Sequence, residues 1–179
     1  IVIKKKGSLV MVSTCALIAA RMGSSRFPGK SLSKIDDKPM LEILAERLLC
    51  SKYIEQIVIA TTKSKEDDAI EDWCSLNNHL CYRGSTDDVL QRLLDAAENF
   101  KIKTIIEVLG DNPLVHSDLV DKSMDLFLTK GHDYVATITN EYGELEPQLK
   151  RFPIGIRVQI FSIETLRKCA TLAKGREYR

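Results

Sequence analysis

The residues best suited to chemistry lie in one stretch, "LIAARMGSSRFPGKSL", which runs from Leu17 to Leu32. Two glycines and three serines accompany three cations there: Arg21, Arg26 and Lys30. Loops of small residues and fixed cations that follow a strand are typical binding sites for phosphate groups. We therefore expect a phosphate-bearing ligand at this loop.

A second candidate is Asp111 in "GDNPL", which directly follows an apolar run. A carboxylate at the end of a strand, facing phosphates, could hold Mg²⁺. An aspartate here could instead cap the next helix, but Ser117 is the better predicted cap. Pro113 favours an extended Asn112 and ends the strand. We therefore predict that Asp111 is the metal ligand.

Composition excludes several classes of protein. The 26 basic and 25 acidic residues leave a net charge of +1, so nothing global favours nucleic acid or a membrane as partner. The five cysteines form no C-x-x-C pair and the three histidines have no metal spacing, so we expect free, buried thiols and no zinc site. No window is long and apolar enough to span a membrane, and the start lacks signal-peptide features. We expect a cytoplasmic protein.

The length of 179 residues suits one domain with one core. We predict a single domain over 1–179, in which Met11 is a candidate natural start and 1–10 an upstream extension.

Six apolar runs predict strands, and their near-continuous apolarity suits a sheet buried on both faces. The runs are 12–20, 54–62, 79–84, 104–110, 134–139 and 154–161. Helical spacing is found in 38–51, 64–78, 85–100 and 116–131. Ser64, and Ser85 with Thr86, are the predicted caps of the second and third helices, and Gly131 the stop of the fourth. The predicted solvated helix face comprises Asp67, Asp68, Glu71 and Asp72.

This alternation predicts an α/β fold, a Rossmann-like three-layer sandwich with a mainly parallel sheet. Ligands of such sheets bind at the carboxyl ends of the strands, where both the loop at Arg21 and Asp111 are expected. The segment 140–153 is predicted to be a polar loop or small lid.

The opening stretch resembles the signature of the cytidylyltransferases that make CMP-activated sugar acids, especially the branch of spore coat polysaccharide biosynthesis protein F. The likeness continues through "KPMLEILAERL", "IVIATT", "YRGSTDDVLQR", "GDNPLVHSDLVD", "FPIGIRVQIFS" and "REY", and so covers nearly the whole chain. It implies a nucleotidyltransferase (GT-A-like) fold. It also implies a Mg²⁺-dependent transfer of CMP from CTP to a sugar or sugar acid, with release of pyrophosphate, for surface polysaccharide synthesis.

The resemblance gives Arg21 and Lys30 the role of phosphate clamps, with Asp111 as the third catalytic residue. Gly23 and Gly29 are expected to let backbone N–H groups approach the phosphates. For Arg26 a solvated loop charge is an equally good interpretation. The expected nucleotide-binding residues are Ala19, Ala20, Arg21, Met22, Gly23, Ser24, Lys30, Thr61, Gly84, Ser85 and Asp88.

The acceptor sugar is expected to contact Asn112, Arg157 and Gln159, and either Arg151 or Arg157 could pair with a substrate carboxylate. The sequence departs from the family here, because Gln159 stands where relatives usually carry an acidic residue. Neutral glutamine is a poor substitute for a carboxylate ligand, so either this position is no ligand or the site depends more on Asp111.

Relatives continue for some tens of residues beyond the "RE" motif, and the resemblance places a homodimer contact and a further aspartate in that part. Two alternatives therefore stay open. One is a related nucleotidyltransferase that uses another NTP, since such loops recognise phosphates rather than bases. The other is a catalytically silent nucleotide-binding protein or fragment.

Overall fold

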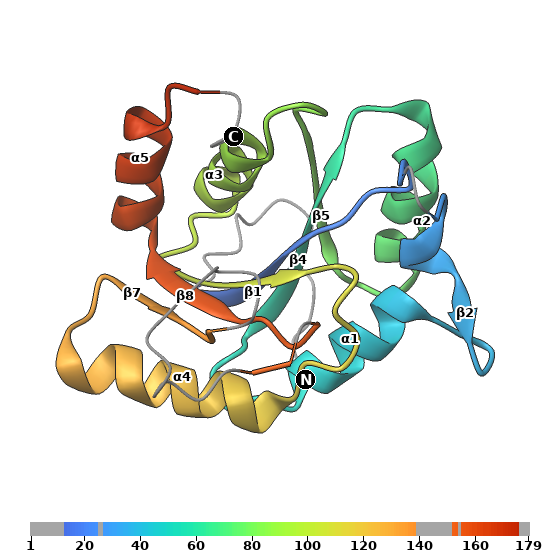
Figure 1. The fold of residues 1–179 in the computed structure, drawn as a ribbon. Coiled ribbons are helices and arrows are strands. Elements are labelled where there is room, and N and C mark those ends of the chain that lie inside the picture. The colour runs from blue at the N-terminus through green and yellow to red at the C-terminus, as the bar shows by residue number, and fades with distance from the viewer. Residues whose placement is uncertain (1–12, 25–26, 139–151, 154, 176–179) are drawn as a thin grey trace.

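The computed structural model describes residues 13–24, 27–138, 152–153 and 155–175. Its centre is a six-stranded sheet in the order β5-β4-β1-β6-β8-β7 (Figure 1). The strands are β1 (Thr14–Ala19), β4 (Gln56–Thr62), β5 (Leu80–Gly84), β6 (Thr104–Leu109), β7 (Tyr134–Ala136) and β8 (Gln159–Ser162). The pairs β1–β4, β1–β6 and β4–β5 are parallel, whereas β8 is antiparallel to both neighbours. The prediction of an α/β sandwich with a mainly parallel sheet is confirmed.

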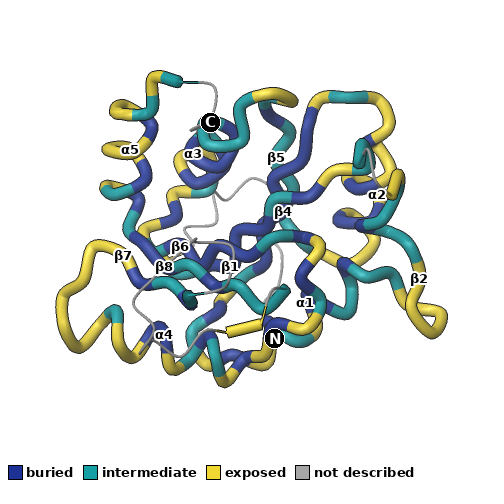
Figure 2. Tube along the Cα trace, viewed as in Figure 1, coloured by how far each residue is buried: buried dark blue, intermediate teal, exposed yellow. Residues whose placement is uncertain are grey.

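In the described part of the chain, five α-helices cover the two faces of the sheet (Figure 1). They are α1 (Met40–Leu49), α2 (Asp68–Leu76), α3 (Val89–Asn99), α4 (Ser117–Lys130) and α5 (Ile163–Leu172). Helices α1, α2 and α4 pack with one set of buried strand residues, and α3 and α5 with the other. Figure 2 shows that the buried residues run through the middle of the molecule, along the central strands.

Continuous apolarity predicted the central strands because β1, β4 and β6 are covered on both faces. Residues 15–18, 57–60 and 105–106 are all fully buried. The last two strands are shorter than predicted: β7, at the edge of the sheet, ends at Ala136, and residues 155–158 precede β8 without belonging to it. Helix α5 was not predicted at all.

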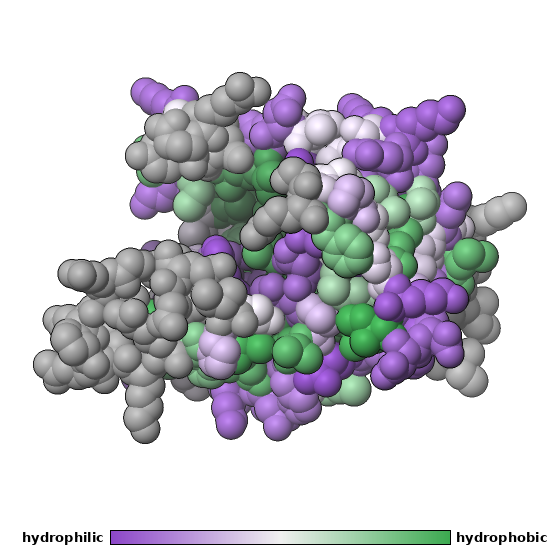
Figure 3. Space-filling view, turned by 45° about the vertical axis from the view of Figure 1, so that its right-hand side comes forward, coloured by the Kyte–Doolittle hydropathy of each residue, from purple (hydrophilic) through white to green (hydrophobic). Residues whose placement is uncertain are grey.

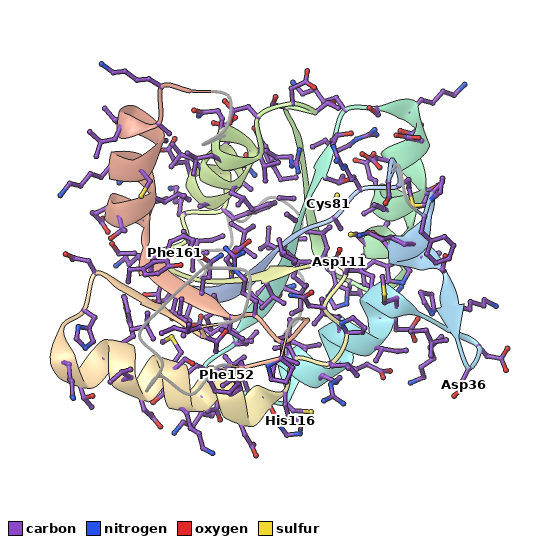
Figure 4. All side chains as sticks on the ribbon, in the orientation of Figure 1. Asp36, Cys81, Asp111, His116, Phe152 and Phe161 are labelled. Carbon is purple, nitrogen blue, oxygen red and sulfur yellow. The ribbon has the colours of Figure 1, made fainter. Side chains whose placement is uncertain are left out.

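A small hairpin was also missed. It joins β2 (Lys34–Ile35) to β3 (Lys38–Pro39) through Asp36 and Asp37, whose φ angles are 46° and 69°. Two positive φ values in a two-residue loop are typical of a type I′ turn, for which aspartate is among the better-tolerated residues. Figure 4 shows Asp36 at the outer tip of this hairpin, away from Asp111.

Three predicted helix starts need correction, because the capping groups lie elsewhere. Helix α3 begins at Val89, where the Asp88 carboxylate accepts the Gln91 N–H at 2.8 Å. Helix α4 is capped by His116, so Ser117 is its first residue rather than its cap. Ser64 makes no side-chain capping bond and precedes a short 3-10 turn, η2 (Lys65–Asp67). The stop at Gly131 is confirmed by its left-handed conformation, with φ of 60°.

The cysteines are free, as predicted, but only Cys15 and Cys74 are buried; Cys50 and Cys169 are exposed.

No helix in the described ranges combines the length and apolarity that crossing a membrane requires. On the face drawn in Figure 3, hydrophilic residues are scattered among hydrophobic ones rather than gathered in one extended field.

Candidate functional site

The candidate site lies where β1 and β6 end side by side. Ala19 pairs with Leu109 in the parallel register, so the loops that follow these strands leave from the same edge. Gly110 brings the two loops together, since its N–H donates to the Ala19 carbonyl at 3.0 Å. A Cβ at Gly110 would lie only 2.9 Å from the Ala20 Cβ. A side chain at position 110 would therefore force the strand ends apart.

A cavity of about 290 Å³ opens at this edge. Its lining residues are Ala19, Ala20, Arg21, Ser24, Lys30, Ser31, Val89, Arg92, Leu109, Gly110 and Asp111. All three predicted catalytic residues are among them, together with Ala19, Ala20 and Ser24 of the predicted nucleotide set. Figure 4 shows Asp111 near the middle of the molecule, at the end of β6.

Lys30 and Asp111 form an ion pair across the mouth of this cavity. Lys30 is held there by a one-turn 3-10 helix, η1 (Lys30–Leu32). The lysine and aspartate side chains are 26% and 37% exposed, so solvent or a ligand can reach both. With Arg21 and Arg92, the cavity lining has three cations against one carboxylate, a net charge of +2 that favours an anionic ligand.

The opening loop satisfies part of its own backbone. The N–H groups of Ser24 and Gly29 both donate to the Met22 carbonyl, at 2.9 and 2.8 Å. The Gly29 N–H is therefore used inside the loop. The expectation that Gly23 and Gly29 let backbone N–H groups approach phosphate stays a prediction. The side chains of Arg21, Ser24 and Lys30 line the cavity, while Ser25 and Arg26 lie outside the described residues.

Asp67 fixes the position of this loop. Its carboxylate accepts the Met22 N–H at 2.6 Å and the Thr62 N–H at 3.2 Å, and it also accepts the Thr62 hydroxyl. The side chain is fully buried, so its assignment to a solvated helix face is wrong. Asp67 ties the end of β4 to the loop that carries Arg21.

The residues predicted to read the base do not line the cavity. Asp88 caps α3, and the Ser85 hydroxyl accepts the Asp88 N–H at 3.0 Å. Gly84 is buried at the end of β5. Thr61 is fully buried, with a hydroxyl that has no hydrogen-bond partner within the described structure. For Asp88, the structural role of a helix cap is the one observed.

Gln159 and Glu107 line a second cavity of about 180 Å³, which residues of α3 and α5 also line. The Gln159 amide donates to the Glu107 carboxylate and accepts the Tyr134 hydroxyl. Burial raises the pKa of the Glu107 carboxyl, against the opposing influence of the Arg157 charge and the Gln159 hydrogen bond. The structure does not place Gln159 in the cavity that contains Asp111.

The other predicted acceptor contacts are divided between the two regions. Asn112 is buried beside Asp111 and turns the chain, since its N–H donates to the Leu109 carbonyl at 3.0 Å. Arg157 is half-buried and acts electrostatically on Glu107. Arg151 and most of the predicted lid at 140–153 lie outside the described residues.

Two buried charged residues of the site region, Asp67 and Arg92, were missed. A local signal existed for Arg92, because it lies three residues after Val89 and four before Ala96, on the core-facing stripe of α3. A charge on such a stripe needs a buried partner or a function. For Asp67 no local signal separates it from its acidic neighbours.

The residues present fit Mg²⁺ in the manner usual for nucleotide enzymes. Asp111 is the only carboxylate among the residues that line the cavity, and no cluster of three or more candidate ligands occurs in the described chain. Magnesium in such sites is bound through one or two carboxylates together with substrate phosphates and water. Asp111 alone could therefore supply the protein's share.

Comparison with known proteins identifies a matching family model and several similar proteins. The family model described as "Cytidylyltransferase" matches residues 15–151. An uncharacterized protein of Methanocaldococcus jannaschii is 37% identical over 158 residues, which cover 88% of this chain and 60% of that protein. The spore coat polysaccharide biosynthesis protein SpsF of Bacillus subtilis is 34% identical over 131 residues, 71% of this chain and 55% of that protein.

Among solved structures, a cytidylyltransferase from Leptospira borgpetersenii matches with a TM-score of 0.82 and 32% identity, covering 94% of this chain and 68% of that one. The matches to the two curated relatives span 60% and 55% of their lengths. The matched model covers well over half of the sequence, and it includes both the loop at Arg21 and the turn at Asp111. The chain therefore belongs to the cytidylyltransferase family.

Proposed function

We propose that this protein transfers CMP from CTP to a hydroxyl of a sugar or sugar acid and releases pyrophosphate. The observation that carries the proposal is the cavity at the ends of β1 and β6, where Arg21 and Lys30 lie with the carboxylate of Asp111. Family membership supports CTP as the nucleotide. The name of the SpsF relative supports a role in surface polysaccharide synthesis, which we place in the cytoplasm.

In this reaction the acceptor hydroxyl oxygen forms a bond to the α-phosphorus, and the bond from that phosphorus to the bridging oxygen breaks. The electron pair leaves with pyrophosphate, so negative charge grows on the leaving group. Arg21 and Lys30 would bind and orient the phosphates while offsetting that charge. Asp111 would hold Mg²⁺, which when bound further neutralises the leaving group.

The acceptor would enter beside Asp111, where Asn112 adjoins the cavity. Arg157 does not line this cavity and acts electrostatically on Glu107, so the proposed pairing of Arg157 with a sugar carboxylate requires an acceptor that reaches beyond the cavity.

The direct test measures pyrophosphate release from CTP, with Mg²⁺, across a panel of neutral sugars and 2-keto sugar acids. Thermal-shift titrations with CTP, UTP, GTP, ATP and dTTP identify the preferred base, because a ligand that binds the folded state raises the midpoint. Turnover with another NTP in preference to CTP would favour the related nucleotidyltransferase. Binding of CTP without turnover of any acceptor would favour the silent nucleotide-binding protein.

A further inference from the structure

Arg92 is a buried cation in the wall of the candidate cavity. It lies in the first turn of α3, its side chain is 2% exposed, and it lines the same cavity as Arg21, Lys30 and Asp111. Arginine stays protonated in proteins. A full positive charge is therefore fixed at this position, with little solvent around it.

This guanidinium is only partly satisfied by the protein. One of its terminal nitrogens donates to the Ser85 carbonyl at 2.5 Å, whereas its Nε is buried without a hydrogen-bond partner. Within the described ranges, no carboxylate oxygen lies within 4.0 Å of it. Burying a charge without a paired counter-charge is costly, and a buried donor without an acceptor adds to that cost. Such a group in a native fold calls for an explanation.

The electrostatics point to a missing anion. Burial lowers the pKa of Arg92, and the positive charge of Arg21 acts in the same direction, while Asp67 and Asp88 oppose it. Two guanidinium groups thus face one cavity, and the two aspartates are committed elsewhere, to the opening loop and to the cap of α3. An anion between the two arginines would relieve the repulsion.

The neighbouring strand end is shaped to admit this arginine. A Cβ at Gly84 would lie 2.8 Å from the Arg92 Cγ and 3.3 Å from its Cβ. Any larger residue at position 84 would push the arginine stem away from its place. The bond to Ser85, the residue after Gly84, then fixes one edge of the guanidinium, while Nε has no hydrogen-bond partner.

We propose that Arg92 is a third cationic ligand for the polyphosphate group of the nucleotide, acting from α3 opposite the loop that carries Arg21 and Lys30. The identity of the ligand as a nucleotide rests on the proposed function, whereas the anion site rests on Arg92 itself. The role expected of Arg92 is binding: its guanidinium donates to phosphate oxygens, and the bond to the Ser85 carbonyl holds the guanidinium in position.

The test uses inorganic tripolyphosphate, measured by titration calorimetry on wild type, Arg92→Met and the matched control Arg83→Met. Arg83 is half-buried and, unlike Arg92, forms ion pairs, with Asp68 at 2.6 Å and with Glu71 at 2.8 Å. We expect Arg92→Met to weaken tripolyphosphate binding by about tenfold or more, the range for a hydrogen bond to a charged group, and Arg83→Met to leave it unchanged. Equal affinity of wild type and Arg92→Met would overturn the proposal.

The thermal midpoint measured without ligand provides a second test. Loss of an arginine that only supports the fold would lower this midpoint. Because Arg92 is buried and unpaired, Arg92→Met is expected to leave the thermal midpoint unchanged or higher, whereas Arg83→Met lowers it. A large fall in the Arg92→Met midpoint, with the tripolyphosphate-induced shift intact, would show that the residue only supports the fold.

If Arg92→Met does not fold, the wild-type protein still answers the question. The Nε–H resonance of Arg92 is expected to shift on addition of tripolyphosphate, because the anion supplies its missing acceptor; no change at saturation would overturn the proposal. The proposed function fails separately: tripolyphosphate binding through Arg92, without CMP transfer to any acceptor, keeps this inference and rejects the enzyme.

Discussion

Lys30 and Asp111 are 81 positions apart in the chain and form an ion pair at the cavity. Each comes from the loop or turn that follows a central parallel strand, and Gly110 lets those two ends approach. In the proposed function, Lys30 binds phosphate and Asp111 holds the metal, so both side chains would face the same ligand. The ion pair keeps the two side chains next to each other at this cavity.

Asp111→Asn is expected to leave the fold intact and to lower Mg²⁺-dependent turnover by about two to three orders of magnitude, the usual cost of losing one preorganised charged group. Pyrophosphate release measured against Mg²⁺ concentration checks this. The exposed Asp72→Asn is the charge-matched control and should behave as wild type. Full Mg²⁺-dependent activity in Asp111→Asn would remove Asp111 from the metal site.

Arg21→Ala and Lys30→Ala are each expected to weaken CTP binding by roughly 1.5 to 3 kcal/mol, the scale of a hydrogen bond to a charged group. CMP lacks the outer phosphates, so at least one of the two changes should affect it less than CTP. Calorimetric titration of both nucleotides checks this, with Lys34→Ala on the exposed hairpin as control. Equal losses for CTP and CMP in both variants would contradict contacts to the outer phosphates.

The sequence predicted the parts of the fold that depend on local pattern. Central strands such as β1 and β4 are buried on both faces, so their apolarity is nearly continuous and predicts a strand. Helix α5 was missed because its buried positions, Ile163, Leu166 and Ala170, are separated by polar and charged residues, giving a weak stripe. The edge strand β7 has only three residues, too few for a clear period.

Some residues of the candidate site could likewise be predicted from local sequence, and others could not. Arg21 and Lys30 could be predicted because their loop has a recognisable composition of small residues and cations. Asp67 could not, since only the folded chain places its carboxylate against Met22 and Thr62 while its neighbour Asp68 stays exposed. The surroundings of a charged side chain depend on the tertiary structure. Only these surroundings distinguish Asp67, which holds the loop, from its acidic neighbours.

Asp67→Ala is expected to lower the free energy of unfolding by about 2 to 4 kcal/mol, because it leaves the N–H groups of Met22 and Thr62 without acceptors. It should also weaken CTP binding, since the loop that carries Arg21 loses its anchor to β4. Urea denaturation measures the first effect and calorimetry the second. Asp72→Ala is the matched surface control, expected within about 0.5 kcal/mol of wild type. An Asp67→Ala protein as stable as wild type would contradict the anchoring role.

Glu107 is expected to make stability fall with rising pH. Its folded-state pKa is raised, chiefly by burial, so between the unfolded and folded pKa values the native protein keeps a proton that the unfolded chain has released. The unfolding free energy therefore declines as pH rises above about 4.3, the ordinary value for glutamate, and levels off beyond the folded pKa. Glu107→Gln removes this titration, so its stability relative to wild type should increase over that pH window.

Urea denaturation at a series of pH values measures this difference, and the exposed Glu164→Gln serves as control because its carboxylate is largely solvated. Arg157 and Gln159, which face Glu107, act against burial by favouring the charged carboxylate. The Glu107→Gln variant should therefore gain over wild type only if burial outweighs both. A stability difference that stays flat from pH 4 to 8, or that moves in favour of wild type, would show that Arg157 and Gln159 together compensate the buried charge.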